Sequence, residues 1–154
     1  MKLAEALIKR ADLKSRIAQI INRMTENALI EEGEDPDEDM IELKALYDSS
    51  MKEQEQLIVR INKTNNETML DDISIAAAIA KRDCLKATIA AYRTLKDAAT
   101  KKPGRYDRHE GNVNIKYIRT VDIAALQKTI DDLSRQYREI DTAIQGRNWN
   151  TDLL

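Results

Sequence analysis

The sequence contains few of the residues that interrupt or cross-link a polypeptide. Its 154 residues include four Gly, two Pro, one Cys and no Phe. Because Gly and Pro are the residues that most often end regular elements, their scarcity predicts a few long elements. The lone Cys84 cannot form an intramolecular disulfide, and its neighbours have no metal-ligand or redox spacing. We expect Cys84 to pack between helices of a protein in the reducing cytoplasm.

Histidine is nearly absent as well, and this removes several classes of catalytic and metal site. The only histidine is His109, whereas di-iron bundles need two Glu-x-x-His pairs and Cys/His zinc sites need several ligands. His109 would be the only ordinary base for a nucleophile, and it falls in an expected loop. No glycine-rich phosphate-binding motif occurs. We therefore expect no catalytic residue, cofactor site, metal site or small-molecule substrate, with a carboxylate-only Mg²⁺ site left open.

Long hydrophobic runs are the third absence. The first apolar run contains Glu5 and Lys9, so it lacks the uninterrupted core of a signal peptide. The best candidate elsewhere, residues 73–80, is far shorter than the roughly 20 apolar residues that span a bilayer. The sequence therefore predicts a cytoplasmic protein without a transmembrane helix.

Apolar residues instead recur at helical spacing along most of the chain. Charged residues make up 34% of the sequence, which is typical of long, surface-rich helices. The pattern predicts four helices, over residues 2–31, 36–63, 75–101 and 121–145. The last has the most regular heptad, formed by Ile123, Leu126, Ile130, Leu133, Tyr137, Ile140 and Ile144.

Capping residues mark some of the expected helix ends. Asp35 followed by Pro36 predicts the start of the second helix, Ser74 can cap the third, and Gly146 is placed to end the fourth. Between residues 104 and 120 the helical period disappears. There Val113, Ile115 and Tyr117 alternate with polar residues, which predicts a short strand and allows a β-hairpin with residues 105–108 in this third connection.

These features predict an all-α fold in which residues 1–154 form a single domain. Each helix should be about 40 Å long at 1.5 Å per residue. The helices can form an antiparallel four-helix bundle, or long coiled-coil-like hairpins whose remaining apolar face is covered by a second subunit. Arg10 and Arg82 occupy apolar-seam positions, so each either extends its guanidinium to solvent or forms a buried ion pair. Acidic partners for such a pair would be Asp12, Glu53 or Asp132.

The charges are segregated between two connections. The first connection and its flanks carry Glu31, Glu32, Glu34, Asp35, Asp37, Glu38, Asp39 and Glu42, with no basic residue among them. The third carries Lys101, Lys102, Arg105, Arg108, Lys116 and Arg119 against Asp107 and Glu110, and six minus two leaves about +4. In an up-down-up-down bundle these connections emerge at the same end. We therefore expect them to dock on each other, within one subunit or between subunits.

The charge pattern leads to a hypothesis of function. We expect a non-enzymatic, homo-oligomeric scaffold or binding module that uses the end bearing residues 104–120. The predicted interaction residues are Arg105, Tyr106, Arg108, Tyr117 and Arg119. A heterologous protein partner is an alternative. Nucleic-acid binding through residues 101–119 is a lesser one, because a neighbouring acidic loop would cancel much of the positive field.

Several short segments also carry a resemblance to a known family. They are Met1 to Leu7 with Arg10 to Leu13, Ile61 to Asn65, Lys81 to Asp83, Arg105-Tyr106, and Thr120 to Asp122 before Leu126-Gln127. Over essentially its whole length the chain resembles the septicolysin family of small bacterial helical proteins. The resemblance implies a bacterial origin and a helical fold, and the family name implies a membrane-active cytolysin as an alternative function. It supplies no active-site residues.

Overall fold

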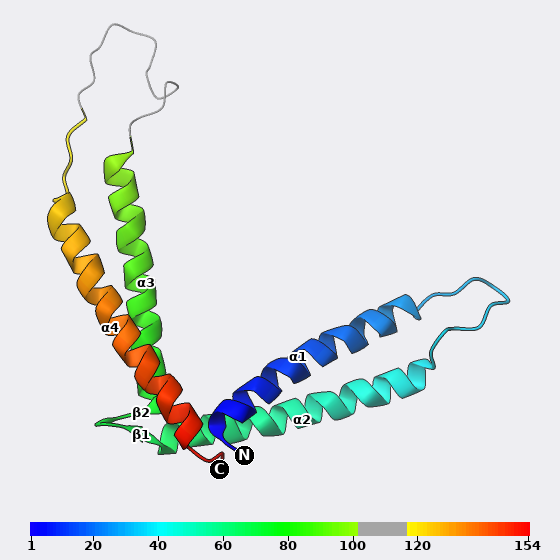
Figure 1. The fold of residues 1–154 in the computed structure, drawn as a ribbon. Helices are drawn as coiled ribbons and strands as arrows, with labels where there is room; N and C mark the ends of the chain where they lie inside the picture. The colour runs from blue at the N-terminus through cyan, green and yellow to red at the C-terminus, as the bar shows by residue number, and fades with distance from the viewer. Residues whose placement is uncertain (102–116) are drawn as a thin grey trace, which may run out of the picture. The chain divides into compact units, whose positions relative to one another are not determined.

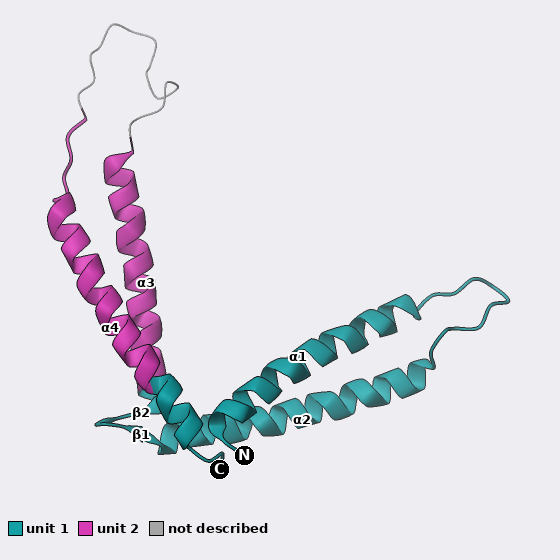
Figure 2. Cartoon of the chain, in the orientation of Figure 1, with its two compact units in different colours: residues 1–77, 144–154 teal, residues 78–143 magenta. Residues whose placement is uncertain are grey.

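The computed structural model describes residues 1–101 and 117–154, and it confirms the all-α prediction (Figure 1). Four long helices account for most of these residues: α1 (Leu3–Glu26), α2 (Met40–Glu67), α3 (Ile75–Thr100) and α4 (Ile123–Asn150). Two short strands, β1 (Met69–Leu70) and β2 (Ile73–Ser74), lie between α2 and α3. The chain divides into two compact units, residues 1–77 with 144–154 and residues 78–143 (Figure 2). The single-domain description stays a prediction.

In the first unit, α1 and α2 lie side by side and antiparallel (Figure 1). Leu13, Ile17 and Ile20 are buried on α1 at a spacing of four and three residues, which places them on one helical face. Leu57 and Ile61 are buried on α2, four residues apart and therefore on one face of that helix. Burial of each such side chain contributes roughly 1.5–3 kcal/mol, so this apolar interface is the main stabilising contact of the hairpin.

The two ends of the chain also meet in the first unit. The amide of Leu3 donates to the carbonyl of Thr151 (2.9 Å), and the amide of Leu153 donates to that of Met1 (3.0 Å). Leu3 is completely buried, and Leu153 is 8% exposed. The amide of Leu154 donates to the hydroxyl of Thr64 on α2 (3.0 Å). The C-terminal tail is thus part of the core of this unit.

A two-residue turn joins the short strands. Met69 pairs with Ser74 and Leu70 with Ile73 in antiparallel register. Asp71 has a φ of 53°, in the left-handed region that turns of this kind require and that Asp tolerates better than most residues. The sequence pattern did not predict this hairpin. The β-hairpin predicted around residues 105–115 lies outside the described residues, and Tyr117 belongs to no strand.

In the second unit, α3 and α4 lie side by side and antiparallel (Figure 1). Lys96 on α3 donates to Gln127 on α4 (2.8 Å). Near the other end of the pair, Arg82 contacts Asp141 at 3.3 Å and Asp83 at 2.8 Å. The Arg82 side chain is 24% exposed, so it forms a partly buried ion pair. Its acidic partners are not those expected from the sequence.

One of two further packing expectations was wrong. Arg10 is exposed, which agrees with the alternative that its guanidinium extends to solvent. Cys84 is exposed rather than packed between helices. The apolar spacing predicts which residues share a helical face, but it does not predict how much of that face a neighbouring helix covers.

Several helix ends differ from the predicted ones. α1 ends at Glu26 rather than near residue 31, and α2 begins at Met40, where the Asp39 carboxylate accepts from the amide of Ile41 (2.7 Å). Asp35 is therefore not the N-cap. α4 continues through Gly146 to Asn150, because the following residues pair with the N-terminal segment and hold its last turn.

Candidate functional site

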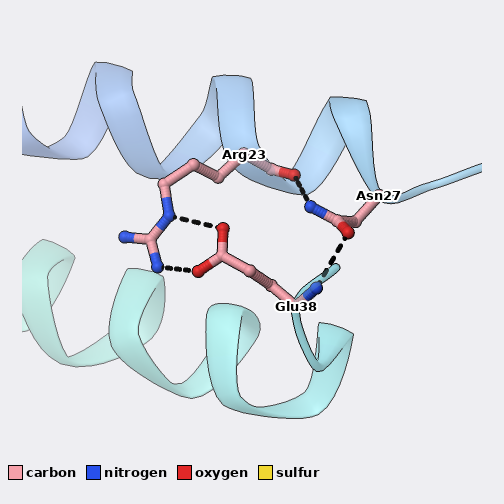
Figure 3. A network of polar contacts seen from close by, with 3 residues as sticks. All are labelled: Arg23, Asn27 and Glu38. Atoms are coloured by element: carbon pink, nitrogen blue, oxygen red, sulfur yellow. Dashed lines mark hydrogen bonds and ion pairs between the residues drawn. The ribbon is translucent and has the colours of Figure 1, made fainter. Parts of the chain in front are cut away.

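A polar network fixes the junction between α1 and the connection that follows it (Figure 3). The Arg23 guanidinium donates to both carboxylate oxygens of Glu38, through Nε at 2.8 Å and through Nη2. Asn27 bridges the same two residues, since its side-chain amide donates to the Arg23 carbonyl (2.9 Å) and its side-chain oxygen accepts from the Glu38 amide (3.0 Å). The hydrogen bonds from Arg23 lower the pKa of the Glu38 carboxyl below its ordinary value. Glu38 therefore stays ionised and anchors the connection.

Residues 27–42, named here the acidic connection, combine negative charge with exposed apolar side chains. The segment has eight carboxylates and no basic residue. Leu29 is 90% exposed and Ile41 is 79% exposed, and Ile30 is also exposed. Gly33 has a φ of 98°, which only glycine adopts readily, so the turn depends on it. Exposed aliphatic residues among carboxylates are typical of a surface that binds a basic, partly apolar partner.

The second unit carries a concave surface at the end of α3, named here the basic apolar cleft. It has a volume of about 440 Å³. Its lining residues are Leu95, Ala98, Ala99, Thr100, Lys101, Tyr117, Ile118, Arg119, Thr120 and Val121. Ile118 is 85% exposed and Tyr117 is 63% exposed. Arg119 Nε donates to the carbonyl of Ala99 (3.1 Å), which connects segment 117–121 to the last turn of α3.

The charged lining residues of the cleft are both cationic. Lys101 and Arg119 lie beside the apolar residues, and none of the described lining residues carries a carboxylate. The nearby Asp122 carboxylate is already used, because it accepts from the amide of Ala125 (3.0 Å) at the start of α4. The cleft can therefore accept an aliphatic side chain flanked by negative charge.

The structure brings two of the five predicted interaction residues together. Tyr117 and Arg119 both line the cleft, whereas Arg105, Tyr106 and Arg108 lie outside the described residues. Sequence reasoning missed the apolar part of the site, mainly Leu95 and Ile118. The sequence did contain an indication of this apolar surface. Ile118 follows Tyr117 directly, and this breaks the alternation of apolar and polar residues expected of an amphipathic strand.

Two kinds of feature are absent from the described residues, namely a group of metal ligands and a membrane-spanning helix. Within residues 1–101 and 117–154, no group of three or more His, Cys, Asp or Glu side chains is placed to hold a metal ion. None of the four helices is both long enough and apolar enough to cross a membrane.

Comparisons with known proteins place the chain in a family. A family model described as a family of unknown function, DUF6847, matches residues 10–153. A crystal structure of a functionally unknown conserved protein from Corynebacterium diphtheriae is similar to the chain, with 32% identity and a TM-score of 0.89. That similarity covers 100% of this chain and 99% of the other. No match was found among curated proteins.

These findings correct the expected septicolysin resemblance. The family model and the similar structure both point to proteins of unknown function, and neither points to a septicolysin. The segments that carried the resemblance are short and scattered, so they are less specific than a match along residues 10–153. Because the family model covers nearly the whole sequence, the chain belongs to the family of unknown function DUF6847.

Proposed function

We propose that the protein is a self-associating interaction protein in which the acidic connection of one copy binds the basic apolar cleft of a second copy. The observation that carries the proposal is that two surfaces of opposite charge both expose large apolar side chains. These are Leu29 and Ile41 on the acidic connection, and Tyr117 and Ile118 at the cleft. The proposed location is the cytoplasm, where the exposed thiol of Cys84 would stay reduced.

Complementary charge would steer and align the two copies. The acidic connection has eight negative charges, and the cleft presents Lys101 and Arg119. Such complementarity mainly increases the association rate and fixes the relative orientation of the partners. The attraction between exposed charges weakens as salt increases, since the screening length is about 10 Å at 0.1 M ionic strength.

Apolar burial would then hold the copies together. A volume of about 440 Å³ lies within the roughly 300–1,000 Å³ range of pockets that enclose small ligands, so it can take one or two aliphatic side chains. Leu29 is the best candidate for insertion, because it is 90% exposed and has carboxylates two and three residues after it. Burial of apolar surface contributes about 25 cal/mol per Å² before the costs of association.

The second copy is the favoured occupant because each chain supplies both halves of the interface. Contacts between two different surfaces of identical chains are heterologous, so they produce rings or open chains rather than only closed dimers. Because the two surfaces differ, the charge of each can be reversed separately, and the assembly of each variant can be measured. A variant with one reversed surface cannot bind itself, but it keeps one normal surface for a partner whose other surface is reversed.

The test uses two charge-reversal variants, and the readout is solution mass by size exclusion with light scattering. Lys101→Glu with Arg119→Glu reverses the charge of the cleft. Replacing Glu31, Glu32, Glu34, Asp35 and Asp37 with Lys reverses the acidic connection, because five lysines against the three remaining carboxylates change its charge from −8 to +2. The wild-type chain should be oligomeric at low salt, and each variant alone should be monomeric. An equimolar mixture of the variants should assemble again, because each surface of one variant then meets a surface of opposite charge on the other. The matched control, Lys14→Glu with Lys81→Glu, changes exposed lysines outside both surfaces and should assemble like the wild type.

Two results would overturn the proposal. One is a wild-type chain that stays monomeric at every protein and salt concentration. The other is assembly that persists in both reversal variants, because the interface would then lie elsewhere. Far-ultraviolet circular dichroism checks that each variant keeps its helical content.

A further inference from the structure

We propose that the face between α3 and α4 carries a second binding site, independent of self-association, for a small organic phosphate. A pocket of about 340 Å³ lies there, within the second unit. Its lining residues are Lys86, Ile89, Ala90 and Arg93 from α3, and Ser134, Tyr137 and Arg138 from α4. The α3 residues are spaced three, one and three apart and the α4 residues three and one apart, so each set shares one helical face. Three of the seven residues are cationic.

The cations of the pocket have no acidic partner in the part of the chain that the structure describes. None of the ion pairs within 4.0 Å there includes Lys86, Arg93 or Arg138. Two carboxylates of α4 are used by other side chains, since Asp141 pairs with Arg82 and Asp131 accepts from Gln127. Three converging positive charges without a carboxylate favour binding of an anion.

The Ser134 hydroxyl is the second, independent observation. Its Oγ atom has almost no access to solvent and makes no hydrogen bond within residues 1–101 and 117–154. The buried hydroxyls of Ser50 and Thr64 behave differently, because each donates to the carbonyl four residues earlier. A buried hydroxyl without a partner is destabilising, which makes its presence informative. To donate to an acceptor on a ligand in the pocket, the shielded hydroxyl would have to rotate about χ1, and it gives up no existing hydrogen bond when it does so.

The chemistry of the lining residues selects a phosphate ester. Arg93 and Arg138 offer planar guanidinium groups that bind phosphate oxygens through two hydrogen bonds, and Lys86 adds a point charge. Ile89 and Ala90 give the pocket an apolar wall, and the Tyr137 ring can stack against a flat organic group. The volume is near the lower end of the range for small-molecule sites, which favours a small ester over a polymer.

The test is calorimetric titration of the full-length chain with three probes. Phenyl phosphate should bind tightest, inorganic phosphate more weakly, and phenol without measurable heat. Arg93→Gln with Arg138→Gln should weaken phenyl phosphate binding at least tenfold, and Ser134→Ala should weaken it severalfold. Arg16→Gln, which removes an exposed arginine from α1, is the matched control and should bind like the wild type.

The outcomes separate this site from the self-association surfaces. The variant Lys101→Glu with Arg119→Glu should keep wild-type affinity for phenyl phosphate, because neither residue lines the pocket. Absence of phenyl phosphate binding at millimolar concentration would overturn the proposal, as would unchanged binding in the double arginine variant with native helical content. Equal affinity for phenol and phenyl phosphate would also overturn it, because the phosphate would then contribute nothing.

Discussion

Replacing Thr64 with Val tests the attachment of the C-terminal tail to α2. Thr64 is completely buried, its hydroxyl donates to the carbonyl of Arg60 (2.9 Å), and its oxygen accepts from the amide of Leu154 (3.0 Å). Val has nearly the same shape, so Thr64→Val leaves packing intact and removes only these two hydrogen bonds. The Arg60 carbonyl keeps its helical partner, whereas the Leu154 amide loses its acceptor. Leu154 is 48% exposed, so water can partly replace the lost acceptor, and the expected cost is that of a typical hydrogen bond, about 0.5–1.5 kcal/mol.

The assay is urea unfolding followed by circular dichroism, combined with hydrogen exchange at the Leu154 amide. We expect the free energy of unfolding to fall by about 0.5–1.5 kcal/mol and the Leu154 amide to exchange faster. Thr129→Val is the matched control, because the Thr129 hydroxyl is exposed and donates only to the carbonyl of Ala125 (3.0 Å). The control corrects for the difference in helix propensity between Thr and Val, and its own effect should stay within about 0.5 kcal/mol.

A specific result would refute this reasoning. If Thr64→Val and Thr129→Val lower the free energy of unfolding equally, the contact between Thr64 and Leu154 contributes nothing to stability. Unchanged exchange of the Leu154 amide would lead to the same conclusion. The tail would then be held by its pairing with the N-terminal segment and by the hydrogen bond from Arg60 Nε to the Leu154 carbonyl (2.8 Å).

Two further predictions concern α4 and the acidic connection. Gly146 lies inside α4, and a Cβ at this position would meet open space. Because Ala is favoured over Gly inside a helix, Gly146→Ala should raise the free energy of unfolding by about 0.5–1 kcal/mol in the same urea assay. A decrease would contradict the helical assignment. The Arg23 guanidinium lowers the pKa of Glu38 below its ordinary value of 4.5, so this pair stabilises the fold above that pH, and the benefit disappears as the pH falls through the lowered pKa. In melting curves between pH 7 and pH 3, Glu38→Gln should be less stable than the wild type near neutrality and equal to it at the acidic end. Glu55→Gln, outside the network, is the control, and a constant difference between Glu38→Gln and the wild type at all pH values would refute the argument.

The helical stripes could be predicted because they depend on local spacing. Leu13, Ile17 and Ile20 repeat every three or four residues, and any helix built from them has an apolar face. Those three side chains are buried. The helix ends could not be predicted in the same way, because Asp35, Asp37 and Asp39 are equally suitable capping residues. The bidentate contact between Arg23 and Glu38 places the start of α2 after Glu38, and that contact joins residues 15 positions apart.

The candidate site was predicted in part for a similar reason. Its positive charge is visible in the sequence, since Lys101 and Arg119 belong to the basic third connection. Its apolar lining depends on segment 117–121 packing beside the last turns of α3, which brings Ile118 near Leu95. These residues are 23 positions apart, and no local pattern relates them. The pocket between α3 and α4 was missed because each helix contributes only half of it.

The sequence by itself determined the all-α class, the four long helices and the separation of acidic from basic connections. These properties follow from composition and from short-range periodicity, which each segment carries independently. Only the tertiary structure decided where the helices end, that Cys84 is exposed, and that residues 151–154 complete the core of the first unit. Those outcomes depend on contacts between residues distant in the sequence, such as Thr64 with Leu154. Such contacts stabilise the structure only after the chain has folded and brought the residues together.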